Sequence, residues 1–272
     1  MRQNKYFIIL LIIFLFNEIQ LNKIYSKERQ FEKINSNDYI ILGSAGLINL
    51  TNLFLEDYSN SNLNAITNLD KSNINFLDKN FVFSYNKDIK LSSDIALGTT
   101  LALPVIYSLF NSSDFGKFFN YNIKYAQVLG LTSSLVLISK NFIDRYRPYT
   151  YDKNLDVETR KSYDGRNSFF SGHTAIAFSS AVFLAYNIEN SDYSRTTKNL
   201  VWAGSLALAS STGVLRILAG KHFLTDVLVG AVVGSAIAIL ISEKYYENIF
   251  INKTSLNFEN LQINYLTFKF KI

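Results

Sequence analysis

Both histidines of the chain, His173 and His222, lie in short segments that also carry glycine and polar or positively charged residues. A third such segment runs from Lys140 to Arg147 and ends at Pro148. Imidazole can act as a nucleophile or a general acid, and ammonium and guanidinium groups bind phosphate oxygens. The three segments together therefore predict a site for phosphate chemistry.

The segment from Arg216 to Asp226 supplies a candidate nucleophile. His222 and Asp226 are four residues apart at a predicted helix start, so the carboxylate can accept a hydrogen bond from Nδ1 of the ring. The Nε2 atom then stays available to attack phosphorus and form a phosphohistidine. Taken alone, the pair is also typical of a merely stabilising contact. Arg216, near the end of an apolar helix, needs an anionic partner unless it reaches solvent.

Two cations of the Lys140 segment predict a phosphate grip. Lys140 and Arg147 are seven residues apart, so a continuing helix would place both on one face. Pro148 ends that helix, because the residue before a proline is pushed out of the α region. Arg147 then suits a bidentate contact with phosphate, and Lys140 acts as a point charge. Arg145 is interpreted as a solvated neighbour.

The tripeptide Ser171-Gly172-His173 predicts an anion site at a helix start. Ser171 precedes an apolar run and is a candidate N-cap, and the free N–H groups of the first turn can bind an anion. Gly172 has no Cβ atom, so the backbone can approach a phosphate. His173 can donate a proton to the departing alkoxide. In isolation, the tripeptide is also typical of a capped helix with an incidental histidine.

Helices must position these segments, and the apolar pattern predicts an all-α bundle of about six core helices with the active site at helix ends. Several are apolar on nearly all sides, which is typical both of a protein core and of a membrane span. Only the last has the composition of a convincing span. The helices are expected at residues 39–55, 91–110, 119–143, 173–188, 197–218 and 223–241. The polar stretch 56–90 is interpreted as a long surface excursion.

Composition limits the classes of protein. With 272 residues and 48% hydrophobic content, the chain can bury one core, so we expect one helical domain over 27–246 with its motifs in 91–241. Scattered lysines and a net charge of +5 argue against a nucleic-acid partner. The absence of cysteine and the presence of two histidines exclude disulfides and Cys- or His-rich metal sites. No metal or cofactor is expected.

Residues 1–26 predict export. Arg2 and Lys5 precede an apolar run, residues 6–16, that is short for a membrane span but suits a signal peptide. No Ala-x-Ala cleavage site follows, so an uncleaved membrane anchor is the alternative. Six spans after an exported start would leave all three motifs facing the cytoplasm. We therefore favour an exported, periplasmic domain in the cell envelope, with an integral inner-membrane protein as the alternative.

Residues 247–272 form a separate tail. From residue 256 onward, apolar and polar residues alternate at close to the two-residue period of a half-buried strand. A short C-terminal β-hairpin or strand is expected there. The segment is too short for a barrel, which excludes an outer-membrane pore.

The order Lys-x6-Arg-Pro, Ser-Gly-His and Arg-x5-His-x3-Asp resembles the type 2 phosphatidic acid phosphatase superfamily. That superfamily includes lipid phosphate phosphatases, bacterial non-specific acid phosphatases and vanadium haloperoxidases. The resemblance implies that His222 is the nucleophile, that His173 is the acid and that Asp226 orients the nucleophile. It also implies a phosphate-binding set, namely Lys140, Arg147, Ser171, Gly172 and Arg216.

Two positions depart from the family pattern without removing a reacting group. Phe170 stands where the family often has proline, and Leu215 stands where it often has serine. The first change affects the turn before Ser-Gly-His. The second removes a hydrogen-bonding side chain before Arg216.

The residues favour a metal-independent phosphatase that acts on phosphate monoesters or diphosphates, with lipid-linked substrates foremost. A vanadate-dependent haloperoxidase needs the same cationic cradle and is the first alternative. A non-catalytic envelope protein that binds a phospholipid headgroup is the second. The aromatic residues, 22 Phe and 17 Tyr, could line a lipid cleft, although such residues more often build ordinary core. The sequence leaves substrate identity, membrane contact and oligomeric state open.

Overall fold

The computed structural model describes residues 34–55, 61 and 63–242, and within them the chain is mostly helical. All six predicted long helices are present, with boundaries within four residues of those expected. The predicted export segment 1–26 and β-tail 247–272 lie outside the described residues. The long helices are α2 (Ser36–Leu55), α4 (Lys87–Asn111), α5 (Phe115–Phe142), α7 (Gly172–Glu189), α8 (Arg195–Leu218) and α9 (Leu224–Ser242).

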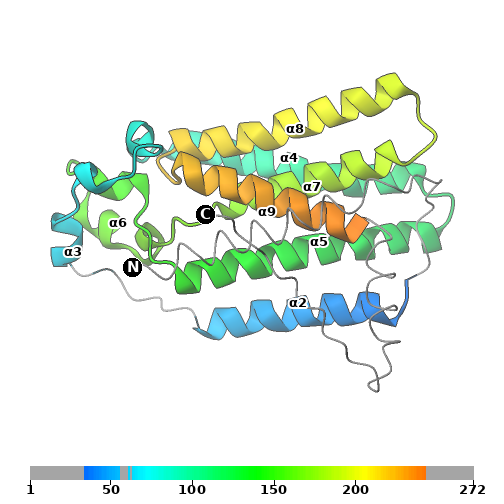
Figure 1. Ribbon diagram of the computed structural model, residues 1–272, viewed down its shortest axis with the longest axis horizontal. Coiled ribbons are helices and arrows are strands. Elements are labelled where there is room, and N and C mark those ends of the chain that lie inside the picture. Colours follow the sequence, from blue (N-terminus) through cyan, green and yellow to red (C-terminus); the bar gives the residue numbers. More distant parts are fainter. Residues whose placement is uncertain (1–33, 56–60, 62, 243–272) are drawn as a thin grey trace, which may run out of the picture.

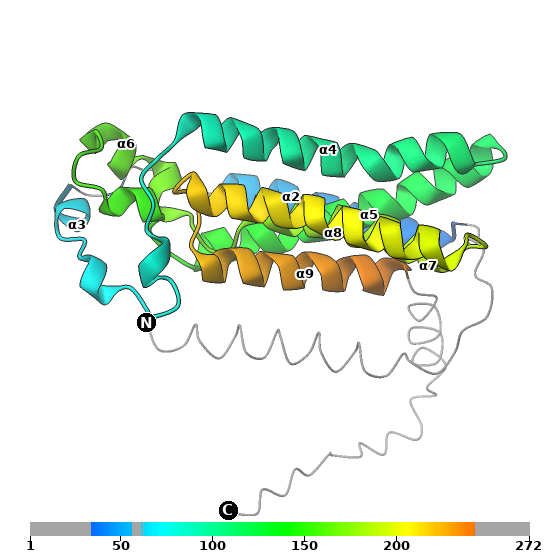
Figure 2. The same cartoon turned by 90° about the horizontal axis from the view of Figure 1, so that it is seen from above.

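The helices form an elongated bundle around α7 (Figure 1). α7 packs against α4, α5, α8 and α9, and α2 covers α5 on the outside. Seen from above, α4 and α9 lie at opposite edges with α8 between them (Figure 2). Two short helices, α3 (Leu63–Thr67) and α6 (Val157–Lys161), lie at one end of the bundle. The same end carries the starts of α4, α7 and α9 and the ends of α5 and α8.

Polar side chains fix where the long helices begin. The Asn86 side chain accepts hydrogen bonds from the N–H groups of Asp88 and Ile89, both at 3.0 Å, before α4. Asp114 accepts from the N–H of Lys117 at 2.9 Å before α5. These acceptors satisfy N–H groups that have no partner inside the helix. These capping contacts therefore fix the first residue of each helix.

Close packing of α7 against α9 depends on glycine. A Cβ atom at Gly234 would lie 2.0 Å from the carbonyl oxygen of Ala175, and one at Gly230 would lie 2.7 Å from that of Ser171. Neither distance is possible for real atoms, so only glycine permits this approach. The start of α9 is thereby held directly against the start of α7.

Among the described residues, three helices, α4, α8 and α9, are long and apolar enough to cross a membrane. The sequence singled out only the last of them. Large apolar side chains lie exposed on all three, including Leu91 at 58%, Phe110 at 84%, Leu200 at 67% and Leu228 at 53%. Apolar surface of this extent is typical of proteins that contact a membrane or another protein. The structure therefore supports membrane association.

The interpretation of residues 56–90 as a surface excursion is wrong for Asp78, which is fully buried. The carboxylate accepts hydrogen bonds from NH2 of Arg145 at 2.6 Å, and from the N–H and hydroxyl of Thr225 at 2.9 and 2.7 Å. A buried carboxylate needs such partners to offset the loss of water. Asp78 thus ties the excursion to the first turn of α9.

Candidate active site

The predicted site residues gather at the end of the bundle that carries α3 and α6 (Figure 1). They come from four helix ends and the loops between them. Lys140 lies in the last turn of α5, Arg147 in the following loop, Ser171, Gly172 and His173 at the start of α7, Arg216 in the last turn of α8, His222 in the loop to α9, and Asp226 in the first turn of α9.

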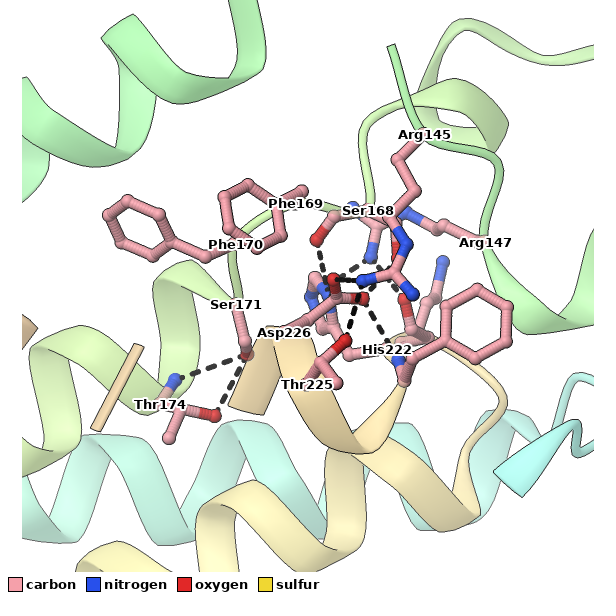
Figure 3. A network of polar contacts seen from close by, with 12 residues as sticks. Arg145, Arg147, Ser168, Phe169, Phe170, Ser171, Thr174, His222, Thr225 and Asp226 are labelled. Carbon is pink, nitrogen blue, oxygen red and sulfur yellow. Dashed lines mark hydrogen bonds and ion pairs between the residues drawn. The ribbon is translucent and has the colours of Figure 1, made fainter. Parts of the chain in front are cut away.

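His222 is 1% exposed and is held at both ring nitrogens (Figure 3). Nδ1 lies 2.8 Å from the carbonyl oxygen of Ser168, and Nε2 lies 3.0 Å from NH1 of Arg147. A carbonyl can only accept a hydrogen bond and a guanidinium can only donate one. The ring must therefore be neutral, with its proton on Nδ1 and a lone pair on Nε2.

Asp226 lies farther from His222 than the i, i+4 spacing predicted. Its Oδ2 is 3.7 Å from Nδ1, whereas it accepts from the hydroxyl of Ser168 at 2.6 Å and from the N–H of Phe223 at 2.9 Å. The other carboxylate oxygen contacts NH1 of Arg145. Asp226 therefore holds the residues that surround His222, while the Ser168 carbonyl makes the direct contact (Figure 3).

Arg145 differs from the solvated neighbour that the sequence suggested. Its guanidinium pairs with both Asp78 and Asp226 and lies 4.5 Å from the centre of the Phe223 ring. Two buried carboxylates on separate segments need a shared cation, and Arg145 supplies it. Its place inside the first motif segment was the only sequence signal for this role.

Arg147 is 3% exposed and lies in the loop after α5. The shared helical face expected for Lys140 and Arg147 is wrong, because α5 ends at Phe142 and the chain is extended at Arg147. The turn is fixed by hydrogen bonds from the N–H of Arg145 to the oxygen of Arg166 and from the N–H of Arg147 to that of Gly165. The loop still brings the Arg147 guanidinium to His222.

His173 contacts a carboxylate on a different helix. Its Nε2 lies 3.0 Å from Oδ1 of Asp94 in α4, and the same oxygen lies 3.4 Å from NH1 of Arg216. Asp94 also pairs with Lys90 at 2.7 Å, one turn earlier. Asp94 is thus the anionic partner expected for Arg216.

Burial and nearby cations keep both histidines neutral. Burial lowers the pKa of His222 well below its usual value, and the charges of Arg147, Arg216 and Lys140 lower it further. Burial and Arg216 lower the pKa of His173 to about 4, while Asp94 opposes the shift.

The Nε donor of Arg216 has no partner among the described residues. The side chain is 4% exposed, NH1 meets Ser93 and Asp94, and the Nε atom is buried without a hydrogen bond. An unpaired buried donor is costly unless a ligand fills it. An anion with oxygen acceptors is the ligand that such a donor fits.

The Ser-Gly-His tripeptide begins α7 as predicted. Ser171 is its N-cap and accepts from the N–H of Thr174. A Cβ atom at Gly172 would lie 2.9 Å from Cγ1 of Val136, so glycine lets α7 start close against α5. The preceding Phe170, which replaces the family's proline, is 3% exposed, and the Phe169–Phe170 peptide bond is cis.

Two further charged residues lie at the site, and the sequence did not single them out. Lys221 directly precedes His222, is 8% exposed, and donates to Oδ2 of Asp164 at 2.8 Å. Oδ1 of Asp164 accepts from NH2 of Arg147 at 2.8 Å. Adjacency to His222 was a signal for Lys221, whereas nothing in the sequence marked Asp164. Among the described residues, no three His, Asp or Glu side chains cluster as metal ligands.

Known proteins match the part of the chain that carries this site. Residues 122–250 match the family model of the PAP2 superfamily, and all the predicted site residues fall inside that range. Phospholipid phosphatase 1 of Rattus norvegicus is 30% identical over 111 residues, which cover 40% of this chain and 39% of that protein. Lipid A 1-phosphatase of Porphyromonas gingivalis is 37% identical over 98 residues, 34% of this chain and 19% of that protein.

The chain thus spans well under half the length of these two relatives. A solved structure is also similar, described as the first transmembrane PAP2 type phosphatidylglycerolphosphate phosphatase from Bacillus subtilis. It covers 78% of this chain and 96% of its own, with 18% identity and a TM-score of 0.46. The family match and the order of the three motif segments make residues 122–250 of this chain similar to the PAP2 superfamily.

Proposed function

We propose that this protein is a lipid phosphate phosphatase that hydrolyses a phosphate monoester or diphosphate through a phosphohistidine at His222. The contact between Arg147 and His222 carries the proposal. NH1 of the arginine lies 3.0 Å from Nε2 of a buried, neutral imidazole. A phosphate held by Arg147 would therefore lie beside the nitrogen that attacks it.

In the first half of the reaction, Nε2 of His222 attacks phosphorus and the bond from phosphorus to the leaving oxygen breaks. The ring gains positive charge, and its Nδ1–H stays bonded to the Ser168 carbonyl, which stabilises that charge. Arg147, Arg216 and Lys140 stabilise the negative charge on the phosphoryl oxygens. The unpaired Nε of Arg216 is a ready donor for one of them.

His173 is the proposed proton donor to the leaving alkoxide, with Asp94 as its positioning residue. The hydrogen bond to Asp94 fixes the ring, and the carboxylate opposes the burial that disfavours the protonated form. A bound phosphate dianion adds negative charge close by and favours the protonated ring further. In the second half, water attacks phosphorus, the bond from phosphorus to Nε2 of His222 breaks, His173 accepts the proton of the water, and inorganic phosphate leaves.

A membrane lipid is the proposed substrate class. The relatives are named phospholipid and lipid A phosphatases, and α4, α8 and α9 could each cross a bilayer. We place the protein in the cell envelope as a membrane-embedded enzyme instead of a soluble periplasmic one, because these helices expose large apolar side chains. Retention in the membrane pellet after an alkaline carbonate wash is the expected behaviour, and release into the supernatant would contradict it.

The test compares wild type and His222→Gln in detergent micelles that contain EDTA, with phosphatidate and p-nitrophenyl phosphate as substrates. Wild type should turn over in the chelator, and the variant should lose at least about a thousandfold in kcat/KM. An alkaline quench of wild type with radiolabelled substrate should leave label on the protein, because phosphohistidine is stable to alkali and labile to acid. Unchanged turnover by a folded His222→Gln protein would exclude His222 as the nucleophile.

A further inference from the structure

Other residues of the protein already accept hydrogen bonds from most of the N–H donors of Arg147. A guanidinium has five N–H donors, and four of those of Arg147 are engaged by acceptors in the described residues. Nε donates to the backbone oxygen of Asp164 at 2.7 Å, and NH1 donates to the Lys221 oxygen at 2.7 Å and to His222 at 3.0 Å. NH2 donates to the Asp164 carboxylate at 2.8 Å.

The carboxylate of Asp164 joins two cations at the site. Its Oδ1 meets Arg147, while its Oδ2 meets Nζ of Lys221 at 2.8 Å and the hydroxyl of Tyr149 at 3.3 Å. Partial loss of water opposes the charge of the half-exposed Asp164 carboxylate, yet Arg147 and Lys221 hold its pKa well below the usual range, so it is negative at neutral pH. The two carboxylate oxygens therefore bind Arg147 and Lys221, the two cations that a phosphate at the same position would bind.

Lys221 has no other carboxylate partner among the described residues. The side chain is 8% exposed, and Nζ lies 4.8 and 5.0 Å from the ring centres of Tyr85 and Tyr149. The aromatic rings favour a cation there, and the cation belongs to the residue that directly precedes His222. If Asp164 turned away, an anion at the same place would be needed to balance Lys221 and Arg147.

We infer that Lys221 is a further phosphate-binding residue and that Asp164 is an internal anion which the substrate phosphate displaces. The inference rests on the proposed function, because it assumes that Arg147 binds phosphate. The Asp164 side chain is 49% exposed, so it can turn toward solvent when the dianion arrives. A dianion binds two cations more strongly than one carboxylate does, which makes the exchange favourable. Competition from the Asp164 carboxylate also weakens binding of the product phosphate.

The test measures the dissociation constant of inorganic phosphate by titration calorimetry on the full-length protein in detergent micelles. Asp164→Asn removes the competing charge and should bind phosphate about tenfold more tightly than wild type. Glu158→Gln, an exposed residue of α6 with the same change in charge, is the matched control and should bind as wild type does. Equal or weaker binding by folded Asp164→Asn would overturn the role of Asp164.

Lys221 is tested separately and in combination. Lys221→Met should weaken phosphate binding about tenfold, whereas the exposed control Lys153→Met should leave it unchanged. The double variant Asp164→Asn/Lys221→Met should lose most of the gain seen in Asp164→Asn alone. Retention of that gain would remove Lys221 from the phosphate site. If Asp164→Asn does not fold, unchanged binding by Lys221→Met alone would overturn the inference.

Phosphate binding needs no turnover, so these results are separate from the proposed function. Lipid turnover by wild type that is abolished in His222→Gln would support the phosphatase even if Asp164→Asn bound phosphate normally. In that case, only the exchange between Asp164 and phosphate would fail. Absence of turnover together with the predicted phosphate affinities would leave an anion site without the proposed reaction.

Discussion

Replacement of Arg147 by lysine keeps the charge and removes the planar fork, which makes it a sharp test of the site. The guanidinium meets Asp164, Lys221 and His222 through four hydrogen bonds, and it is 3% exposed. An ammonium is a point charge that cannot reproduce a bidentate contact with phosphate.

The expected loss follows from the contacts that lysine cannot make. At least two charge-assisted hydrogen bonds disappear, each contributing about 1.5–3 kcal/mol. The retained charge recovers part of this, so we expect a net loss of about 3–4 kcal/mol in the transition state, or two to three powers of ten in kcat/KM.

The assay is the initial rate of phosphatidate hydrolysis in mixed micelles over a range of substrate concentrations for Arg147→Lys and wild type. Arg195→Lys is the matched control, because Arg195 is 72% exposed at the opposite end of α8. The control should retain full activity. A value of kcat/KM for folded Arg147→Lys within threefold of wild type would refute the bidentate role of Arg147.

Three other results are expected. Asp94→Asn removes the charge that opposes the lowered pKa of His173, so the alkaline limb of the kcat/KM profile should move to lower pH. Turnover of alkyl phosphates should fall more than turnover of p-nitrophenyl phosphate, because the alkoxide needs the proton more. Equal losses on both substrates would contradict the role of Asp94. Gly230→Ala should destabilise the protein by about 1–3 kcal/mol, because the new Cβ would lie 2.7 Å from a backbone oxygen. Gly204→Ala is the control and should leave the stability unchanged, because its new Cβ would meet nothing within 4 Å. The thermal unfolding midpoints of the two variants test this difference. The pKa of buried His222 lies below its unfolded value of about 6.5, so the unfolded chain gains the proton first as the pH falls. The free energy of unfolding should therefore fall by about 1.4 kcal/mol per pH unit below about pH 6.5. The same measurement on His222→Gln should give a smaller slope, and identical slopes would count against a buried, neutral ring.

The long helices could be predicted from the sequence because each carries a long stretch that is mainly apolar. The starts of α4 and α5 lie four residues before the predicted positions. Each helix directly follows a capping residue, Asn86 or Asp114. α4 then opens with the charged residues Lys87 and Asp88, whereas α5 opens with Phe115. Apolar periodicity detects where a helix is buried, whereas capping determines where it begins.

The polar contacts between distant segments could not be predicted in the same way. The motif spacing predicted that His173, His222 and Arg216 belong to one site. Asp94 lies 79 residues from His173, which it contacts, and Asp164 lies 57 residues from its partner Lys221. No local spacing rule relates residues that far apart, so only the folded bundle identifies them.

The motif that contains Asp226 predicted a different contact for its carboxylate from the one in the structure. The i, i+4 spacing suggested a direct hydrogen bond to His222, yet Nδ1 of the ring donates to the Ser168 carbonyl. Asp226 in turn accepts from the Ser168 hydroxyl and contacts Arg145, which also binds Asp78. The orientation of the His222 ring therefore depends on a chain of buried contacts. Each added link fixes the ring more firmly, because a carboxylate that bound only the imidazole would be free to rotate with it.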